Sequence, residues 1–161
     1  MTPDPISRAP HFPVAIALGS NLGDREANLR NAASALSEHV QGLRLSSFIE
    51  TAPVGVGPQP NFLNAAAVGH TSLSPRELLN LLLATEQQFG RERPYPGAPR
   101  TLDLDLILHD AAVLDEPGLV VPHPRFRDRL FVLLPLVEIA ADWRDPVTGR
   151  TVEELVRTAT A

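Results

Sequence analysis

Two aspartates separated by one residue are the strongest chemical signal in this sequence. Asp103 and Asp105 lie in the apolar run 101–108, which predicts a β-strand. Side chains alternate between the faces of a strand, so both carboxylates point one way and the neighbouring leucines the other. Carboxylates this close repel each other unless a cation lies between them. We interpret the pair as a Mg²⁺ site shared with substrate phosphates; the alternative is two solvent-exposed acids.

Arginine residues gather on both sides of this pair. All 14 basic residues of the 161-residue chain are arginine, which excludes every mechanism that needs a lysine, including the Walker A lysine and a Schiff base. Six of them flank the aspartates: Arg91, Arg93, Arg100, Arg125, Arg127 and Arg129. A guanidinium can donate two parallel hydrogen bonds to a phosphate, so the arrangement favours a polyanion over ordinary surface ion pairs. Arg125 and Arg127 are the two least expected to point inward.

The composition restricts the class of protein. There is no cysteine, which excludes disulfides and thiolate chemistry, and the net charge of −5 argues against a general nucleic-acid binder. No apolar stretch is long enough to cross a bilayer. The run 12–18 is short and lacks a basic start, so it predicts a buried first strand rather than a signal peptide. We therefore expect a cytoplasmic protein that binds neither nucleic acid nor membrane.

The pattern of apolar residues predicts an α+β fold. Strands are expected at 14–18, 43–50, 62–70 and 101–108, and helices at 25–38, from a Ser74 capping box to Gly90, at 131–140 and from Thr151 onward. The order βαββαβ is the ferredoxin-like arrangement, an antiparallel sheet with its helices packed on one face, here with a C-terminal helical extension. We expect residues 1–12 to be a flexible tail and 13–161 a single catalytic domain. The other sheet face is expected to be covered by the loops and the C-terminal segment, or left open as a site.

Two weaker signals lie elsewhere. The Pro- and Gly-rich stretch 51–61 is followed by Phe62 and Asn64, which could stack on a flat ligand and read its edge, or could belong to an ordinary surface connection. His123 lies between two prolines beside the second arginine group. An isolated histidine is more often structural than catalytic, so this position is a candidate only in combination with its neighbours.

Four segments in register resemble one known family. GSNLGD, ETAPVG…QPNFLNAA, PRTLDLDLIL and VPHPR…R.FVL.PL.EIA, within residues 14–140, are similar to the pterin pyrophosphokinases of folate biosynthesis. The resemblance implies that the protein transfers pyrophosphate from ATP to the hydroxymethyl group of 6-hydroxymethyl-7,8-dihydropterin and releases AMP. It also implies two Mg²⁺ ions on Asp103 and Asp105. We expect the protein to be a monomer.

The resemblance implies further site residues. Contacts to ATP are expected from Glu86, Arg93, Arg100, Leu106, His123 and Arg129. Arg91 and Arg100 are expected to assist catalysis together with the aspartates. The pterin is expected to meet Thr51, Val54 and Asn64 at its edge and Phe62 and Phe131 on its two faces. Gly97 stands where members of the family often carry an aromatic residue, and the stretch 94–98 is short. The loop before the aspartate strand, which covers the site in the family, is therefore expected to close differently here.

Two other functions fit parts of the sequence. A magnesium-dependent nucleotidyltransferase would pair a Gly-Ser with a nearby D-x-D, but Gly19 and Ser20 lie far before Asp103 in the chain. A non-catalytic ferredoxin-like ligand-binding module would need no magnesium and turn over nothing. Release of AMP distinguishes the pyrophosphokinase from the first, and any turnover distinguishes it from the second.

Overall fold

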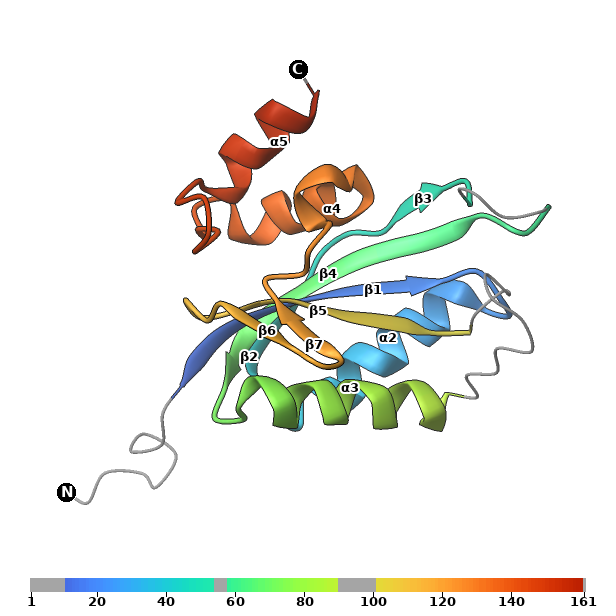
Figure 1. The fold of residues 1–161 in the computed structure, drawn as a ribbon. Helices are drawn as coiled ribbons and strands as arrows, with labels where there is room; N and C mark the ends of the chain where they lie inside the picture. Colours follow the sequence, from blue (N-terminus) through green and yellow to red (C-terminus); the bar gives the residue numbers. More distant parts are fainter. Residues whose placement is uncertain (1–10, 54–57, 90–100, 161) are drawn as a thin grey trace.

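A five-stranded antiparallel sheet forms the centre of the protein in the computed structural model, which describes residues 11–53, 58–89 and 101–160 (Figure 1). Its strands are β1 (Phe12–Ser20), β2 (Gln41–Leu45), β3 (Ile49–Thr51), β4 (Phe62–Thr71) and β5 (Asp103–His109). Their order is β2-β4-β1-β5, with β3 paired to the end of β4. The two central strands, β1 and β4, pair along nine residues each, which fixes the register on which the site depends.

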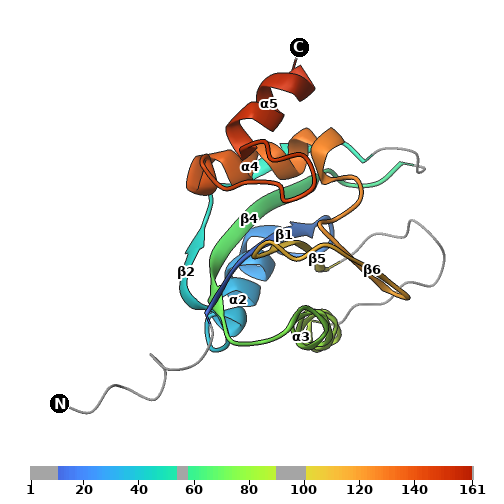
Figure 2. The same ribbon diagram turned by 60° about the vertical axis from the view of Figure 1, so that its left-hand side comes forward.

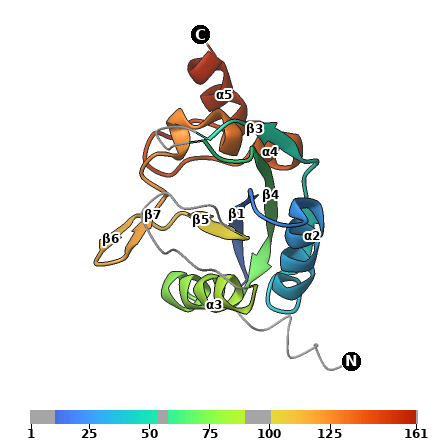
Figure 3. The ribbon, with the colours of Figure 1, turned by 90° about the vertical axis from the view of Figure 1, so that its right-hand side faces the viewer.

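Helices cover both faces of the sheet. They are α2 (Arg25–Leu36), α3 (Pro75–Gln88), α4 (Leu130–Ala140) and α5 (Val152–Thr160). Figures 1 and 3 show α2 and α3 on one side of the sheet and α4 with α5 on the other. The α+β class, the βαββαβ order with its two helices on one face, and the C-terminal helical extension are thus confirmed.

Alternation along β1 and β4 supplies two separate apolar cores. Val14, Ile16 and Leu18 pack with α2 and α3, whereas Ala15 packs with α4 and α5. The three consecutive alanines of β4 divide in the same way, with Ala66 on the α4 side. The small side chain of Ala66 lets α4 lie close to the sheet, and packing on both faces explains why a stretch that is weak by strand propensity forms a central strand.

The helix starts follow local hydrogen bonding. Asp24 accepts a hydrogen bond from the backbone N–H of Ala27 at the start of α2. Ser74 and Glu77 form the expected capping box at the start of α3, and Pro75 occupies its first position. The helix α3 ends at Gln88, and Gly90, its expected stop, lies outside the described residues.

The structure departs from the sequence prediction in four places. The strand expected at 43–50 is interrupted, because Ser46 and Ser47 turn their hydroxyls to other partners: Ser46 Oγ accepts from the N–H of Ala66, and Ser47 Oγ donates to Glu138 on α4. A hairpin of β6 (Leu114–Glu116) and β7 (Leu119–Val121) and a 3₁₀ helix η1 (Phe126–Asp128) were not expected. The strand β1 also begins at Phe12, inside the expected tail.

The buried carboxylate of Asp145 fixes the C-terminal extension to η1. The side chain of Asp145, 0% exposed, accepts from Arg127 Nη2 at 2.9 Å, from Thr148 Oγ1 at 2.7 Å and from the N–H of Val147 at 3.0 Å. Burial would raise the pKa of Asp145, but the hydrogen bonds from Arg127, Thr148 and Val147 outweigh it and lower the pKa to about 2. The ion pair connects η1 to the turn between α4 and α5, which Figure 2 shows beside α4.

The close approach of β2 to β4 predicts a sensitive glycine. A methyl group added at Gly69 would lie 2.6 Å from Val40 Cγ1 and 2.8 Å from the carbonyl oxygen of Gln41. We expect Gly69→Ala to lower the free energy of unfolding by about 1–3 kcal/mol in urea denaturation, because backbone and a buried side chain must move. Gly19→Ala is the matched control, since its nearest new contact is an ordinary 3.4 Å. Equal stability of the two variants would contradict the packing.

Asp145 predicts an acid-sensitive contribution to stability. Its folded-state pKa, about 2, lies below the ordinary value of 3.8, so the ionised form stabilises the fold above pH 4 and this stabilisation is lost as the pH falls toward 2. The shift corresponds to about 2 kcal/mol. We expect the free energy of unfolding of the wild type to fall more steeply between pH 5 and pH 2 than that of Asp145→Asn. Parallel curves for the two proteins would show that the carboxylate is not ion-paired as described.

Candidate active site

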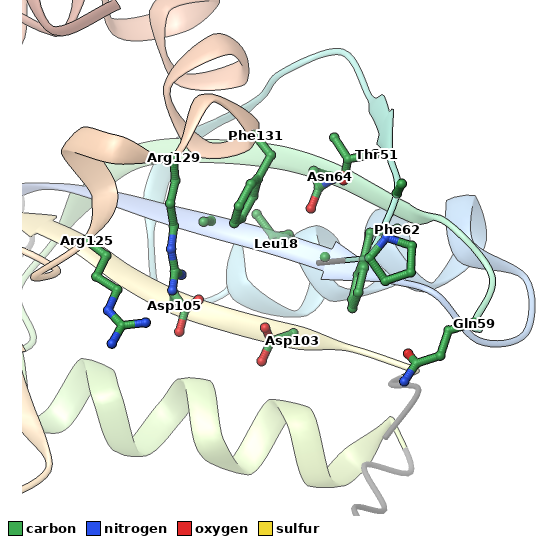
Figure 4. A pocket seen from close by; sticks show the side chains of 14 residues that line it. Leu18, Thr51, Gln59, Phe62, Asn64, Asp103, Asp105, Arg125, Arg129 and Phe131 are labelled. Carbon is green, nitrogen blue, oxygen red and sulfur yellow. Dashed lines mark hydrogen bonds between the residues drawn. The ribbon is translucent and has the colours of Figure 1, made fainter. Parts of the chain in front are cut away.

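A cavity of about 480 Å³ lies between the sheet, the segment after β3 and the start of α4. Residues of β1, β4 and β5 line it together with Arg129 and Phe131 (Figure 4). Ala17 and Gly19 form part of its floor, directly opposite Asp105 and Asp103 in the pairing of β1 with β5. These small residues leave open the space in front of the two carboxylates.

The aspartate pair faces this cavity. Asp103 and Asp105 both line it and are half-buried, whereas Leu104 and Leu106 are buried in the core against α2 and α3. The alternation expected from the sequence is therefore confirmed. Among the described residues, no group of three or more acidic or histidine side chains could hold a metal by itself. Two carboxylates fit Mg²⁺, which leaves its other positions to water and to substrate oxygens.

The arginines around η1 divide between two directions. Arg125 and Arg129 line the cavity, and Arg127 pairs with Asp145 away from it. Arg127 points away from the cavity, as expected, whereas Arg125 faces it, contrary to the expectation. The reason is the unexpected 3₁₀ helix, which carries Arg125 and Arg129 at its two ends and so brings both to the cavity wall. Figure 4 shows both guanidinium groups on the side of the cavity where Asp105 lies.

His123 lies behind this cationic wall. Its Nδ1 accepts a hydrogen bond from the backbone N–H of Arg125 at 3.2 Å, so the proton of the neutral ring is on Nε2. Burial, the charge of Arg129 and the charge of Arg125 lower the pKa of His123, and Asp103 opposes them. The ring is therefore neutral at neutral pH and has one N–H to donate.

Two aromatic rings and an amide occupy the other end of the cavity. Phe62 begins β4 and Phe131 lies in the first turn of α4, and both rings face the cavity near Leu18 (Figure 4). Asn64, 6% exposed, donates from Nδ2 to Thr51 Oγ1 at 2.7 Å, which fixes the orientation of its amide. A cavity end lined by two aromatic rings, with an oriented amide beside them, suits a heterocycle.

Gln59 completes this end of the wall. Asn21, itself fully buried after β1, donates from Nδ2 to Gln59 Oε1 at 3.0 Å and to the carbonyl oxygen of Pro60 at 3.3 Å. Arg25 donates to the carbonyl oxygen of Asn61 at 2.8 Å. These hydrogen bonds hold the segment before β4 to the turn between β1 and α2, and so position Phe62.

Comparisons with known proteins agree with this geometry. Residues 15–141 match the model of the family described as 7,8-dihydro-6-hydroxymethylpterin-pyrophosphokinase. The chain belongs to this family. It is 46% identical over 145 residues to the 2-amino-4-hydroxy-6-hydroxymethyldihydropteridine pyrophosphokinase of Bacillus subtilis, covering 88% of this chain and 87% of that protein. It is 44% identical over 143 residues to the enzyme of the same name from Synechocystis, covering 88% of this chain and 73% of that protein.

A solved structure shares the fold of this pyrophosphokinase at low sequence identity. A Plasmodium falciparum HPPK-DHPS crystal structure superposes with a TM-score of 0.74 at 12% identity, over 94% of this chain and 44% of that one. This likeness supports the fold alone. The family and the class of enzyme expected from the sequence are confirmed by the closer relatives, and none of the matches reported above supports the nucleotidyltransferase or the non-catalytic module.

The cavity brings together most of the predicted site residues that the structure describes. They are Thr51, Phe62, Asn64, Asp103, Asp105, Arg129 and Phe131. Glu86 and Leu106 are buried instead: Glu86 accepts from the backbone N–H of Leu104 at 3.1 Å, and Leu106 packs in the core. His123 is described but is not among the residues that line the cavity. Val54, Arg91, Arg93 and Arg100 lie outside the described part of the chain.

Sequence reasoning missed Arg125 and Gln59 as wall residues. Gln59 lies within the segment QPNFLNAA, in which only Phe62 and Asn64 were predicted to contact a ligand. Arg125 and Arg129 are four residues apart in the sequence, but whether both face the same cavity depends on the 3₁₀ turn between them. No pattern in the sequence singles out that turn.

The charges around His123 predict its titration. We expect NMR of the ring to give a pKa below 6.5 in the free enzyme, and Arg125→Ala to raise it, because one of the cations that disfavour protonation is removed. Arg76→Ala is the control, since Arg76 pairs with Glu116 on the β6–β7 hairpin. An unchanged midpoint in Arg125→Ala would contradict the placement of this guanidinium beside the ring.

Proposed function

We propose that this cavity transfers the pyrophosphoryl group of ATP to the hydroxymethyl group of 6-hydroxymethyl-7,8-dihydropterin, giving AMP and the pterin diphosphate in folate biosynthesis. The observation that supports this proposal most directly is that one cavity has aromatic residues at one end and a pair of carboxylates at the other. Phe62, Phe131 and Asn64 suit a flat heterocycle, and Asp103 and Asp105 suit a metal-bound polyphosphate. An alcohol attached to the heterocycle would then lie next to the phosphates, which is the arrangement that transfer requires.

The pterin is held between the rings of Phe62 and Phe131. Stacking on each ring contributes on the order of 1 kcal/mol beyond the burial of apolar surface. Asn64 reads the edge of the bicycle with its oriented amide, and Thr51 holds that amide in place. Val54 is proposed to close the same edge from the segment that follows β3. An amide that is already oriented loses less conformational entropy on binding.

The phosphates of ATP are held on the side of Asp103 and Asp105. We propose that these two carboxylates hold two Mg²⁺ ions. Bound magnesium would neutralise the triphosphate and make the pterin alcohol more acidic. Arg125 and Arg129, whose guanidinium groups lie on the side of Asp105, add positive charge there, and Arg91, Arg93 and Arg100 are proposed to add more from the segment before β5. Glu86 and Leu106 are proposed to contact ATP from the α3 side of β5, the face opposite Asp103 and Asp105.

His123 is proposed to donate a hydrogen bond to ATP. Its Nδ1 is occupied by the N–H of Arg125, which leaves Nε2–H as the donor. Because burial and the two neighbouring arginines lower its pKa, the ring donates without adding a charge at neutral pH. Its role is therefore to orient a phosphate or the nucleotide rather than to neutralise it.

The protein is further proposed to act as a monomer in the cytoplasm. None of the described helices is both long and apolar enough to cross a membrane. Sedimentation equilibrium of the purified chain tests the monomer, and fractionation of expressing cells tests the location.

Phosphorus NMR of the enzyme with ATP, Mg²⁺ and the hydroxymethylpterin tests the reaction. We expect signals of AMP and of a pterin diphosphate, and chelation of the metal should stop the reaction until Mg²⁺ is restored. Asp105→Asn is expected to lower kcat by about 10²–10³, the cost of removing one group that stabilises charge in the transition state. Asp115→Asn, an exposed carboxylate on β6, serves as the control and should keep wild-type turnover.

The products distinguish the alternatives. Release of ADP would exclude transfer of a pyrophosphoryl group, and release of free pyrophosphate would indicate nucleotidyl transfer. A wild-type rate in Asp105→Asn would remove the metal-binding role of this carboxylate.

A further inference from the structure

Three arginines lie at alternate positions in residues 125–129, around η1. They do not share one role. Arg125 and Arg129 stand at the two ends of the 3₁₀ helix and line the cavity. Arg127, in the middle, points the other way and gives both Nε and Nη2 to Asp145. Like charges this close repel each other, so the direction of each side chain needs a structural cause.

The partner of Arg127 is a rigid point in the C-terminal turn. Asp145 is fully buried, and its backbone bonds close the turn: its N–H donates to the carbonyl oxygen of Arg150 at 2.9 Å, and its carbonyl oxygen accepts from Gly149 at 2.8 Å. The side chain of Thr148 and the N–H of Val147 hold the carboxylate from two more sides. A bidentate pair with a fixed carboxylate therefore sets the position of the Arg127 guanidinium.

Other contacts connect Arg127 rigidly to the cavity wall. Its guanidinium carbon lies 4.9 Å from the centre of the Phe126 ring, and Phe126 is fully buried against α4 and α5. The N–H of Arg129 donates to the carbonyl oxygen of Phe126 at 3.2 Å, and the carbonyl oxygen of Arg129 accepts from Val132 and Leu133 at 3.0 Å each. A displacement of η1 would thus move Arg129 and the start of α4 together.

We propose that Asp145, acting through Arg127, is a positioning residue that holds Arg125 and Arg129 toward the phosphate side of the cavity. This proposal rests on the proposed function, because it assigns those two arginines to the phosphates of ATP. Asp145 itself does not line the cavity and touches no substrate. Its contribution is to bind the middle arginine away from the cavity, so that the 3₁₀ turn cannot rotate to place Arg127 there instead.

Binding of a non-reacting nucleotide tests the proposal. The probe is ATP with a methylene group in place of the oxygen between the α and β phosphorus atoms, titrated with Mg²⁺ by calorimetry. We expect Asp145→Asn to raise its Kd about tenfold, or about 1.4 kcal/mol, because an amide places a donor against the donors of Arg127. The Kd of 6-hydroxymethylpterin, measured with the nucleotide saturating, should change less than twofold. Arg127→Lys keeps the charge but not the fork, and should give an intermediate Kd.

A double-mutant cycle separates positioning from a general effect on structure. In an Arg125→Ala/Arg129→Ala background, Asp145→Asn should raise the nucleotide Kd less than twofold, because the groups through which it acts are gone. A tenfold effect that persists in that background overturns the proposal, as does wild-type nucleotide affinity in Asp145→Asn. Val152→Ala, which removes buried contacts from the same C-terminal core, is the matched control and should leave the nucleotide Kd unchanged.

The outcomes also separate this proposal from the proposed function. If the wild type fails to bind the nucleotide, the proposed function fails. If the wild type binds it and the Asp145 variant binds equally well, only the positioning role fails. Should circular dichroism show that Asp145→Asn is unfolded, Arg127→Lys decides: wild-type affinity in that variant overturns the proposal.

Discussion

The alternation of side chains along β5 connects the core of this protein to its chemistry. Leu104 and Leu106 are buried against α2 and α3, so the strand cannot shift by one residue without exposing them. The same register places Asp103 and Asp105 in the cavity, opposite the small residues Gly19 and Ala17 of β1. Hydrophobic burial thus supplies the energy that holds two like charges side by side, and the Mg²⁺ proposed to bind there would remove their repulsion.

The C-terminal extension converts this sheet face into a site. The helix α4 packs on Ala66 and Val68 of β4, and its first turn supplies Phe131 to the cavity. Its other end is attached to the sheet edge: Arg44 donates to the carbonyl oxygen of Ile139 at 2.6 Å, and Glu138 accepts from the N–H of Ser47 at 3.0 Å. A helix fixed at its far end and beside η1 holds the backbone of Phe131 in place, which favours binding of a flat ligand.

Arginine serves here in two ways that depend on its surroundings. Paired with buried Asp145, the guanidinium of Arg127 is a structural cross-link whose hydrogen bond to that carboxylate raises its pKa. Next to the cavity, Arg129 lies with its guanidinium carbon 5.5 Å from the centre of the Phe131 ring, and so touches the residue proposed to stack on the pterin. The two ends of the cavity that are proposed to hold the phosphates and the pterin are therefore linked by one cation–aromatic pair.

The sequence by itself determined the fold class, the capped helix starts and the direction of the aspartate pair, because each depends on periodicity or on contacts within a few residues. The segments that carry the family resemblance also predicted Phe62, Asn64, Arg129 and Phe131, which the structure brings into one cavity. Only the tertiary structure decided that Arg125 faces the cavity, that Arg127 turns to Asp145, and that residues 43–50 are interrupted. Those features depend on partners distant in the chain, such as Asp145, Ala66 and Glu138, whose proximity follows from packing and not from local pattern.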